Sequence, residues 1–313
     1  MLNIQVQLSV ATMINHPKVT FFLEDSLRKQ AEAGNHNFLK LVSEVLQESR
    51  FQVSYAHPDQ ADARDGSHAL FHMQHPDRSN GVTVRRSYYY PFWQIERTSE
   101  RWNWDVARAS FDPSDVDPKT ARQFYRFWQK RLFKDAPSTT SKAGFVYVPL
   151  QGKLLNQRSF QTHSPLDMVR HVLAQDRKRD VIATLHPGEH YVPKELNALK
   201  RLEQKEPRLS LRMGEMDALL PHCDYIVTEN SSVAFAGYFF KKPSILFAGI
   251  DFHHIANKVS DLGVEGAFQR VLDVKPNYPV YVWWFLQHQS INGGRPDAKY
   301  RIRQRLIDLG WPV

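Results

Sequence analysis

Two turns that follow predicted strands carry side chains able to hold a phosphate group. His186-Pro187-Gly188 comes directly after the apolar run 181–185, and Asn230-Ser231-Ser232 follows 224–228 and opens the next predicted helix. A helix N-terminus offers free N–H groups and a positive dipole end to an anion, and two hydroxyls add donors. An imidazole held by a rigid proline can donate to the same phosphate or protonate a leaving group. These residue types at two strand ends predict binding of a phosphorylated ligand.

Each of these signals also has a structural explanation. A Ser pair at a helix start is commonly an ordinary N-cap. His-Pro pairs occur four times in this chain, at His16, His57, His75 and His186. His186 differs from the others because it directly follows a predicted parallel strand, as the Ser pair does two strands later.

Two further strand-end or cap residues extend the predicted site. Gln151 follows the apolar run 145–150, and Ser164 is placed to cap a helix whose first position is Pro165. The predicted nucleotide- and phosphate-binding residues are therefore Gln151, Ser164, His186, Pro187, Gly188, Asn230, Ser231 and Ser232.

Transfer of a group from such a phosphate to a hydroxyl needs a carboxylate that removes the hydroxyl proton. The candidates in the N-terminal half are Glu24, Asp25, Glu96 and Glu100. We favour Glu96, with His186 as the second catalytic residue, because an aromatic-rich loop suits sugar stacking and can raise a carboxyl pKa by desolvation. The alternative is that Glu96 only forms a surface pair with Arg97 or Arg101.

The segment 85–111 is rich in aromatic residues and arginine and has no clean period. We predict that Arg85, Arg86, Trp93 and Glu100 bind an acceptor, since guanidinium groups suit an anionic one and aromatic rings stack on sugars. The alternatives are that the aromatic residues are core and that the arginines are a solvated pair.

The elements that must position these residues are clearest after residue 140. Short apolar runs alternate with amphipathic helices, which predicts right-handed crossovers and a parallel, doubly wound sheet. The predicted strands span 145–150, 180–185, 209–212, 224–228 and 244–247. The predicted helices begin at Ser164-Pro165 and span about 193–206, 215–220 and 231–240.

The first half is less regular but is consistent with a second α/β domain. Its predicted strands span 4–8, 51–55 and 69–71, and its predicted helices 21–33, 37–48 and 118–133. A small, polar segment at 135–142 is the predicted linker. The predicted fold class is α/β, with two Rossmann-like doubly wound domains facing a cleft. They are an acceptor-binding domain at 1–137, a nucleotide-binding domain at 143–295, and a helix at 296–313 that packs back on the first domain.

Composition narrows the class of protein. The 313 residues carry a net charge of +8, of which +6 falls after residue 140, so an anionic partner is expected. A single cysteine, Cys223, excludes a disulfide framework and a cysteine-rich zinc site, and its apolar surroundings predict a buried thiol. Neither a signal peptide nor a run of about 18 apolar residues is present, which predicts a cytoplasmic protein.

The segment 280–287 is very apolar and precedes a basic helix at about 296–309. One explanation for the apolar character of this segment is structural: it is buried where the chain crosses back to the N-terminal domain. The alternative is a peripheral contact with the inner face of the cytoplasmic membrane, since Trp283 and Trp284 beside basic residues suit anionic headgroups.

In this order, the motifs at 145–151, Ser164-Pro165, His186-Pro187, 228–237 and Lys242-Pro243 resemble the bacterial capsule polysaccharide biosynthesis proteins. These include Kdo transferases and share an HP motif and a Ser/Thr motif with bacterial sialyltransferases. The resemblance covers about residues 144–250. It departs from the family's pattern at Phe239-Phe240-Lys241, where a small residue or glycine usually precedes Lys-Pro.

The resemblance implies a GT-B fold and a CMP-activated acidic sugar, Kdo or a sialic-acid relative, as donor. It also implies inverting, metal-independent transfer to a capsule or surface glycan or glycolipid, with no cofactor besides the co-substrate. His186, Ser231 and Ser232 would then hold the CMP phosphate. The sequence offers no DxD motif, in agreement with metal-independent transfer.

Two other functions remain open at this point. A UDP-GlcNAc 2-epimerase would also use His-Pro and a Ser-rich turn, but those enzymes usually carry Asp-Ser-Gly-Gly where this chain has Glu229-Asn230-Ser231-Ser232. A nucleic-acid-binding protein would suit the charge, but no recognised nucleic-acid-binding motif is present and the basic residues do not cluster in one segment. We therefore predict no nucleic-acid partner.

Overall fold

A computed structural model describes residues 16–313, which form two compact units. Unit 1 runs from the first described residue to Arg86 and includes Trp93–Ser99 and Gly293–Val313. Unit 2 comprises Ser87–Phe92 and Glu100–Asn292. The chain forms two six-stranded sheets, which confirms the predicted α/β class with two Rossmann-like sheets. The strand predicted at 4–8 lies outside the described residues.

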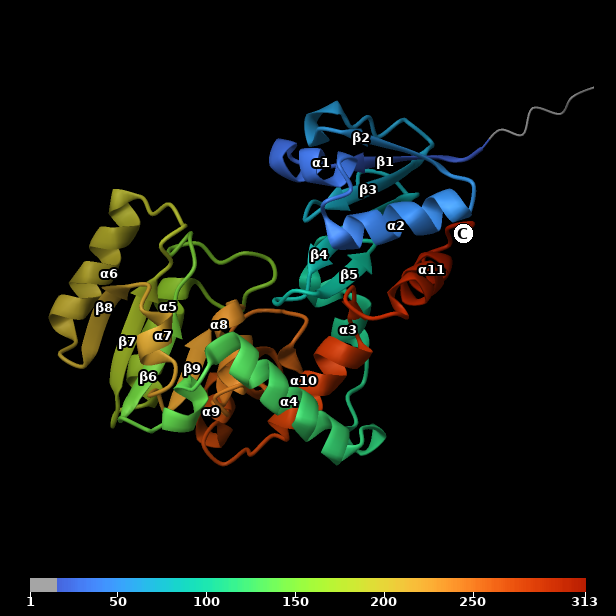
Figure 1. Ribbon diagram of the computed structural model, residues 1–313. Helices are drawn as coiled ribbons and strands as arrows, with labels where there is room; N and C mark the ends of the chain where they lie inside the picture. The colour runs from blue at the N-terminus through green and yellow to red at the C-terminus, as the bar shows by residue number, and fades with distance from the viewer. Residues whose placement is uncertain (1–15) are drawn as a thin grey trace, which may run out of the picture. The chain divides into compact units, whose positions relative to one another are not determined.

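Unit 1 holds five neighbouring strands of the first sheet, in the order β5-β4-β3-β1-β2 (Figure 1). Strands β1, β2, β3 and β4 are parallel to one another, and β5 runs antiparallel to β4. The strands are β1 (Lys18–Phe22), β2 (Gln52–Ala56), β3 (His68–His72), β4 (Gly81–Arg86) and β5 (Phe92–Glu96). The helices are α1 (Asp25–Glu32), α2 (Asn37–Glu48) and α11 (Ala298–Asp308), with a 3-10 turn at Pro58–Gln60.

Helix α2 shows why unit 1 folds as it does. Its apolar residues recur at helical spacing, and all of the following are buried: Phe38, Leu39, Val42, Val45 and Leu46. The helix was predicted with these bounds. Helix α1 begins four residues later than predicted, because Lys18–Phe22 forms β1 and is paired on both sides.

Unit 2 contains a fully parallel sheet in the order β11-β10-β9-β6-β7-β8. Its strands are β6 (Phe145–Pro149), β7 (Asp180–Leu185), β8 (Leu209–Met213), β9 (Tyr225–Thr228), β10 (Ser244–Leu246) and β11 (Asn257–Lys258). Its helices are α3 (Asp105–Arg108), α4 (Pro118–Phe133), α5 (Pro165–Gln175), α6 (Pro193–Lys205), α7 (Met216–Leu219), α8 (Ser232–Tyr238), α9 (Val259–Arg270) and α10 (Tyr278–Trp283). Short 3-10 turns span Arg101–Asn103, Pro113–Asp115, Ala136–Thr139 and His253–Ile255, a π-helical turn spans Trp284–His288, and the two-residue strand β12 is Ile291–Asn292.

Alternate residues of the unit 2 strands enter two cores, one on each face of the sheet. Tyr147 and Ile182 join a cluster with α4, α8 and α10. Val146, Val148 and Val181 join a cluster with α5, α6 and α9. Both faces are therefore covered, as a parallel sheet requires.

The boundary between the units differs from the predicted linker at 135–142. Helix α4 belongs to unit 2, because it buries Ala121, Tyr125 and Trp128 in that unit's core. The Tyr125 hydroxyl also donates a 2.7 Å hydrogen bond to the Tyr238 carbonyl oxygen. The chain instead changes unit between residues 86 and 100, and again at 293, so that α11 returns to unit 1 and packs on α2.

Two composition-based expectations can be compared with the described residues. Cys223 is fully buried, and burial raises the pKa of its thiol to about 12. Within residues 16–313, no helix combines the length and apolar character needed to cross a membrane.

Candidate functional site

In unit 2 the sheet order defines where a ligand is expected. If the strands β6 to β11 are numbered 1 to 6 along the chain, they lie side by side in the order 3-2-1-4-5-6, which is the common order of dinucleotide-binding sheets. The chain leaves β6 toward one edge of the sheet and leaves β9 toward the other edge. The two connections therefore diverge and leave a crevice at the carboxyl ends of β6 and β9. Gln151 and Gly152 follow β6, and Glu229 and Asn230 follow β9. The strand-end residues selected from the sequence therefore lie at the ligand-binding edge of this sheet.

His186 lies one residue beyond β7, next to this crevice, and its side chain is exposed. The Gly188 N–H donates a 3.1 Å hydrogen bond to its Nδ1. In the neutral ring the proton is then on Nε2, so that Nε2 is a donor for a ligand. The Tyr191 hydroxyl accepts a 2.8 Å bond from the His186 backbone N–H and holds the turn in place.

Gly152 lies where the Glu189 side chain approaches the loop after β6. A Cβ atom at this position would lie 2.5 Å from Oε2 of Glu189, which follows β7. A side chain here would displace Glu189 from the loop after β6. The half-buried Gln151 precedes this contact.

Two of the three Ser residues of the predicted site, Ser164 and Ser231, form local side-chain hydrogen bonds. Ser164 Oγ accepts from the Asp167 N–H at 3.2 Å and donates to the Asp167 carboxylate at 2.7 Å, so it caps α5 as predicted. Ser231 Oγ accepts from the Val233 N–H at 3.3 Å and is buried. Ser232 is exposed, and Asn230 is half-buried. Of the three, Ser164 uses its hydroxyl both as donor and as acceptor within one helical turn.

Sequence reasoning passed over Glu229, although it lies between β9 and the Asn-Ser-Ser turn. Its side chain is 2% exposed, and Oε2 lies 3.4 Å from an Arg158 guanidinium nitrogen. Its Oε1 makes no hydrogen bond within the described residues. Burial raises the pKa of Glu229 to about 7, and Arg158 and Gln161 counteract part of this rise. The crevice therefore contains a carboxyl group that can hold or release a proton near neutral pH. The position of this acidic residue directly after a predicted strand was the feature of the sequence that could have identified it as a site residue.

This raised pKa makes the free energy of unfolding pH-dependent. A carboxyl with a raised folded-state pKa contributes stability below its unfolded value, 4.5, and loses it as the pH rises through about 7. At ~1.4 kcal/mol per pKa unit, the loss is about 3 kcal/mol. Glu229→Gln is expected to match the wild type near pH 5 and to exceed its free energy of unfolding by roughly this amount near pH 8. Urea denaturation at a series of pH values measures the difference, and a constant difference would contradict the prediction.

A buried charged cluster in unit 2 was also not predicted. Asp251, beyond β10, is fully buried; it accepts a hydrogen bond from the Tyr88 hydroxyl and a 3.1 Å bond from Arg101. The Arg101 guanidinium lies 4.1 Å from the centre of the Tyr88 ring. This cluster fixes the aromatic segment that begins at Ser87. Glu100, the next residue before Arg101, is exposed and accepts a 2.6 Å bond from Asn103.

Unit 1 has its own polar cluster at the carboxyl ends of three neighbouring strands, β3, β1 and β2. Glu24 follows β1 and is exposed. Its Oε2 lies 3.2 Å from Nε2 of His57, which follows β2, and its Oε1 accepts a 3.4 Å bond from Gln74, which follows β3. The Asp59 N–H donates to His57 Nδ1 at 3.4 Å, which leaves Nε2–H to donate to Glu24. An exposed carboxylate, oriented by an imidazole, is the arrangement of a general base.

Cationic and strained residues adjoin this cluster. Burial and the neighbouring charges of His36, Arg85 and Arg86 lower the pKa of His72, the last residue of β3, to about 4. Arg85 is half-buried and Arg86 exposed at the end of β4. Met73 adopts a left-handed backbone conformation, with φ of 62°, and its side chain is 47% exposed. Strain of this kind concentrates at functional sites.

The structure places Glu96 and Trp93 inside unit 1. Glu96 is 3% exposed, and its Oε2 lies 2.8 Å from the Arg305 guanidinium of α11. Trp93 is 4% exposed and stacks on Phe38, with ring centres 4.9 Å apart. Glu96, which the sequence favoured as the base, is therefore a buried, ion-paired carboxylate, and Trp93 has no exposed stacking face. All five residues of β5 are buried, with Trp93 packed against Phe38 of α2 and Glu96 paired with Arg305 of α11.

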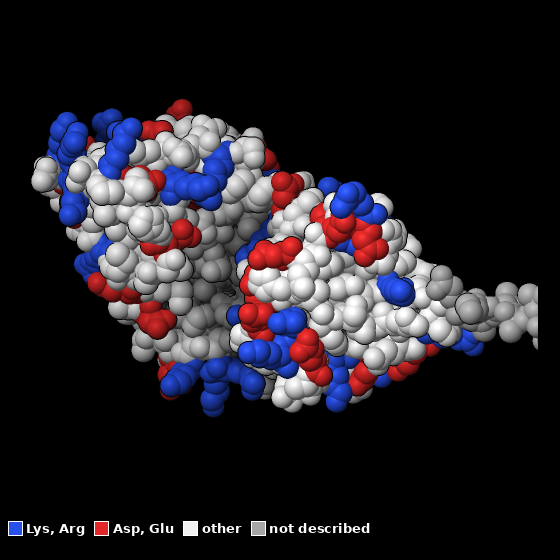
Figure 2. Space-filling view, turned by 90° about the horizontal axis from the view of Figure 1, so that it is seen from above, with Lys and Arg blue, Asp and Glu red and all other residues white. Residues whose placement is uncertain are grey.

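The C-terminal segment has a structural role. Trp284 is buried and Trp283 half-buried in the core of unit 2. In α11, Lys299 and Arg303 form ion pairs of 2.8 to 2.9 Å with acidic residues of α2. On unit 1, at the right of the view in Figure 2, blue and red side chains are mixed. Trp284 thus packs inside unit 2, and Lys299 and Arg303 are paired within unit 1.

No protein-family model and no curated protein matches the chain. Among solved structures, it is similar to the KpsC beta Kdo 2,7 transferase of Thermosulfurimonas dismutans, with a TM-score of 0.52, 12% identity, and 94% of this chain and 99% of that chain covered. The KpsC beta Kdo 2,4 transferase of the same organism has a TM-score of 0.46 and 13% identity over 85% and 89% of the two chains. The UDP-GlcNAc 2-epimerase of Neisseria meningitidis has a TM-score of 0.34 and 7% identity over 94% and 98%. Together with its two Rossmann-like sheets, the similarity to the 2,7 transferase shows that the chain has a fold of the GT-B type.

Proposed function

We propose that the chain is a glycosyltransferase that takes an acidic sugar, Kdo or a sialic-acid relative, from a CMP-activated donor. The observation that carries the proposal is the crevice of unit 2. There, a sheet in the dinucleotide-binding order presents His186 beyond β7 and Asn230-Ser231-Ser232 beyond β9. The GT-B type of fold, shared with a transferase of Kdo, supports the choice of reaction and donor.

Unit 2 would bind the donor. His186 donates from Nε2 to the phosphate, and the hydroxyls of Ser231 and Ser232 donate to the same group. Negative charge grows on this phosphate as CMP departs, so donors fixed beforehand stabilise the transition state more than the ground state. Gln151, at the end of β6, would contact the nucleotide.

Unit 1 would act on the acceptor, a glycan or glycolipid hydroxyl. The acceptor oxygen attacks the anomeric carbon while the Glu24 carboxylate takes the hydroxyl proton, and the bond between that carbon and the phosphate oxygen breaks to release CMP. Arg85 and Arg86 would bind an anionic acceptor. Direct displacement by one base inverts the anomeric centre, and NMR of the product tests this. Retention would exclude the single displacement.

We propose that the reaction needs no metal and no cofactor besides the CMP-sugar. His186 and the Ser pair would supply the phosphate donors themselves. Transfer rates measured with and without EDTA test this, and a loss of transfer on chelation that added metal restores would contradict it.

The donor site is tested by calorimetric titration with CMP and UDP. His186→Ala is expected to weaken CMP binding by about 10- to 100-fold, the loss typical of a hydrogen bond to a charged group. His190→Ala is the matched control, since His190 is exposed and lies four residues further along the same loop. Unchanged CMP affinity in His186→Ala would refute the phosphate assignment. A preference for UDP would refute the CMP donor and favour an epimerase-like enzyme.

A further inference from the structure

Unit 2 has a second concave surface, at the opposite edge of its sheet from the nucleotide crevice. A cavity of about 810 Å³ lies between α4, the segment 137–142, and the turn that leads into β10. Asp224 and Lys142 on its wall precede β9 and β6, so the cavity lies at the amino ends of these strands. A strand of five residues separates the two edges by ~17 Å. We call this cavity the basic pocket.

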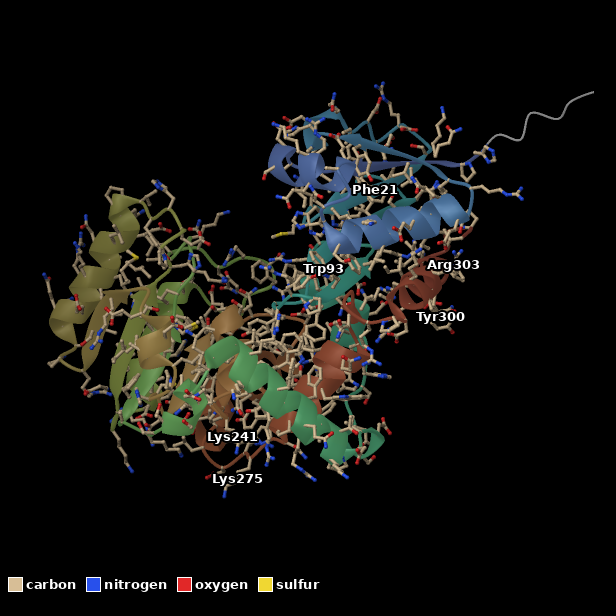
Figure 3. All side chains as sticks on the ribbon, viewed as in Figure 1. Phe21, Trp93, Lys241, Lys275, Tyr300 and Arg303 are labelled. Carbon is tan, nitrogen blue, oxygen red and sulfur yellow. The ribbon has the colours of Figure 1, made fainter. Side chains whose placement is uncertain are left out.

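Six exposed cations line the basic pocket. Three of them recur every four residues along α4, so they lie on one face of the helix, ~6 Å apart along its axis, and Lys134 follows at the same interval just beyond the end of the helix. The six are Arg122, Arg126, Lys130, Lys134, Lys142 and Lys241. In Figure 3, Lys241 lies beside α4, on the edge of unit 2.

These six cations have no carboxylate partner within 4.0 Å among residues 16–313. Two carboxylates also line the pocket: Asp224 is engaged with Arg179 at 2.6 Å and with the Gly144 N–H at 3.0 Å, and Asp135 is exposed next to Lys134. Like charges four residues apart on a helix are destabilising. An anionic ligand would offset that repulsion.

A buried lysine holds the wall of the pocket in shape. Lys242 is 3% exposed, and its ammonium donates to the carbonyl oxygens of Ser141 at 2.6 Å and Cys223 at 2.7 Å. These bonds tie the segment before β6 to the segment before β9. The cationic residues on either side, Lys142 and Lys241, are thereby carried on a fixed backbone.

The shape of the pocket selects among anionic ligands. Its cations line a hollow, which a flat bilayer cannot enter, and the row on α4 extends over ~18 Å, longer than a single phosphate needs. Between the cations lie Gln129, Ser138, Thr140 and Ser141, whose oxygen atoms can accept hydrogen bonds from sugar hydroxyls. A linear polymer with repeated charges and many hydroxyls fits this lining.

We propose that the basic pocket binds a linear anionic glycan, with a carboxylate or phosphate on successive sugars, outside the nucleotide crevice. The choice of a glycan as the polyanion rests on the proposed function, whereas the charge and the shape of the pocket do not. A site of this kind would keep the growing chain on the protein between transfers.

The test is fluorescence binding of a labelled oligosialic acid, a linear glycan with one carboxylate per sugar, to the full chain. The triple variant Arg126→Gln, Lys130→Gln, Lys134→Gln is expected to bind at least ~10-fold more weakly and with a flatter dependence on salt. The control, Lys194→Gln, Lys200→Gln, Lys205→Gln, removes the same charge from exposed positions of α6 and is expected to bind as the wild type does. A neutral dextran oligosaccharide is expected not to bind.

Several results would overturn the proposal. Equal losses in the α6 and α4 variants would mean that only net charge matters. The same titrations are made with inorganic phosphate, an oligonucleotide and phosphatidylglycerol vesicles. If one of these binds more tightly than oligosialic acid, and the triple variant loses that binding, the pocket belongs to that ligand instead. CMP titration of the same proteins separates this proposal from the proposed function. Glycan binding without CMP binding refutes the function alone, and CMP binding with no pocket-dependent glycan binding refutes the pocket alone.

Discussion

Glu24→Gln is expected to lower kcat for sugar transfer by roughly 10²- to 10⁴-fold, the usual contribution of a general base. The amide keeps the shape of the side chain and one acceptor oxygen, so it retains one of the two bonds from His57 and Gln74, but it cannot take the acceptor's proton. Because Glu24 is exposed, the free energy of unfolding should stay within about 0.5 kcal/mol of the wild type. The two measurements together separate loss of a base from loss of structure.

Asp25→Asn is the matched control. Asp25 is the next residue along the chain, is exposed, and forms a 2.9 Å ion pair with Arg28 in the first turn of α1. Its pKa is lowered by that hydrogen bond, which identifies it as a helix-stabilising group rather than a proton acceptor. Its replacement should change kcat by less than ~3-fold, since exposed pairs contribute little. Full activity in Glu24→Gln with loss in Asp25→Asn would transfer the role to Asp25.

Glu96→Ala is expected to lower the free energy of unfolding by about 3 to 5 kcal/mol, because it leaves the largely buried Arg305 without this carboxylate. Arg305 is also held by a 2.8 Å bond from Nε to the Ile95 carbonyl oxygen, so it cannot simply turn to solvent. Denaturant unfolding measures the loss. The double variant Glu96→Leu, Arg305→Met is expected to recover most of it, since a buried pair can be replaced by apolar groups at little cost.

An exposed ion pair between α2 and α11 provides the control for the buried pair of Glu96. Glu48 on α2 pairs with Lys299 and Arg303 on α11, and its side chain is 50% exposed. Glu48→Ala should therefore cost less than about 1 kcal/mol. If Glu96→Gln kept its stability but lost transfer activity, Glu96 rather than Glu24 would be the base.

Most of the donor-side site could be predicted because its residues follow strands of one parallel sheet. Strands β6, β7, β9 and β10 are short, mostly apolar runs; polar residues follow β7 and β9 at once and β6 after one further apolar residue. Parallel strands bring their carboxyl ends to one edge, so Gln151, His186 and Asn230 could be grouped before any coordinates were known. Glu229 was missed because the effect that matters, loss of solvent around its carboxyl, depends on how the loop with Arg158 covers it.

The first half was harder to predict because its polar cluster joins residues far apart in the chain. Glu24, His57 and Gln74 meet only through the pairing of β1 with β2 and β3. No strand was predicted at β1, whose last two residues were included in the helix predicted at 21–33. Glu96 and Trp93 were assigned to an irregular loop because an aromatic-rich segment without a clean period does not reveal a buried strand that packs against α2 and α11.

The sequence by itself determined the α/β class, the parallel sheet of unit 2 and the edge at which its ligand should bind, because these follow from local periodicity and from residues next to each other in the chain. The tertiary structure decided which carboxylates are exposed, which are paired and which are buried, and it gathered six cations from three segments into one pocket. Burial and pairing depend on neighbours distant in the chain, and the chemistry of a charged group depends on both.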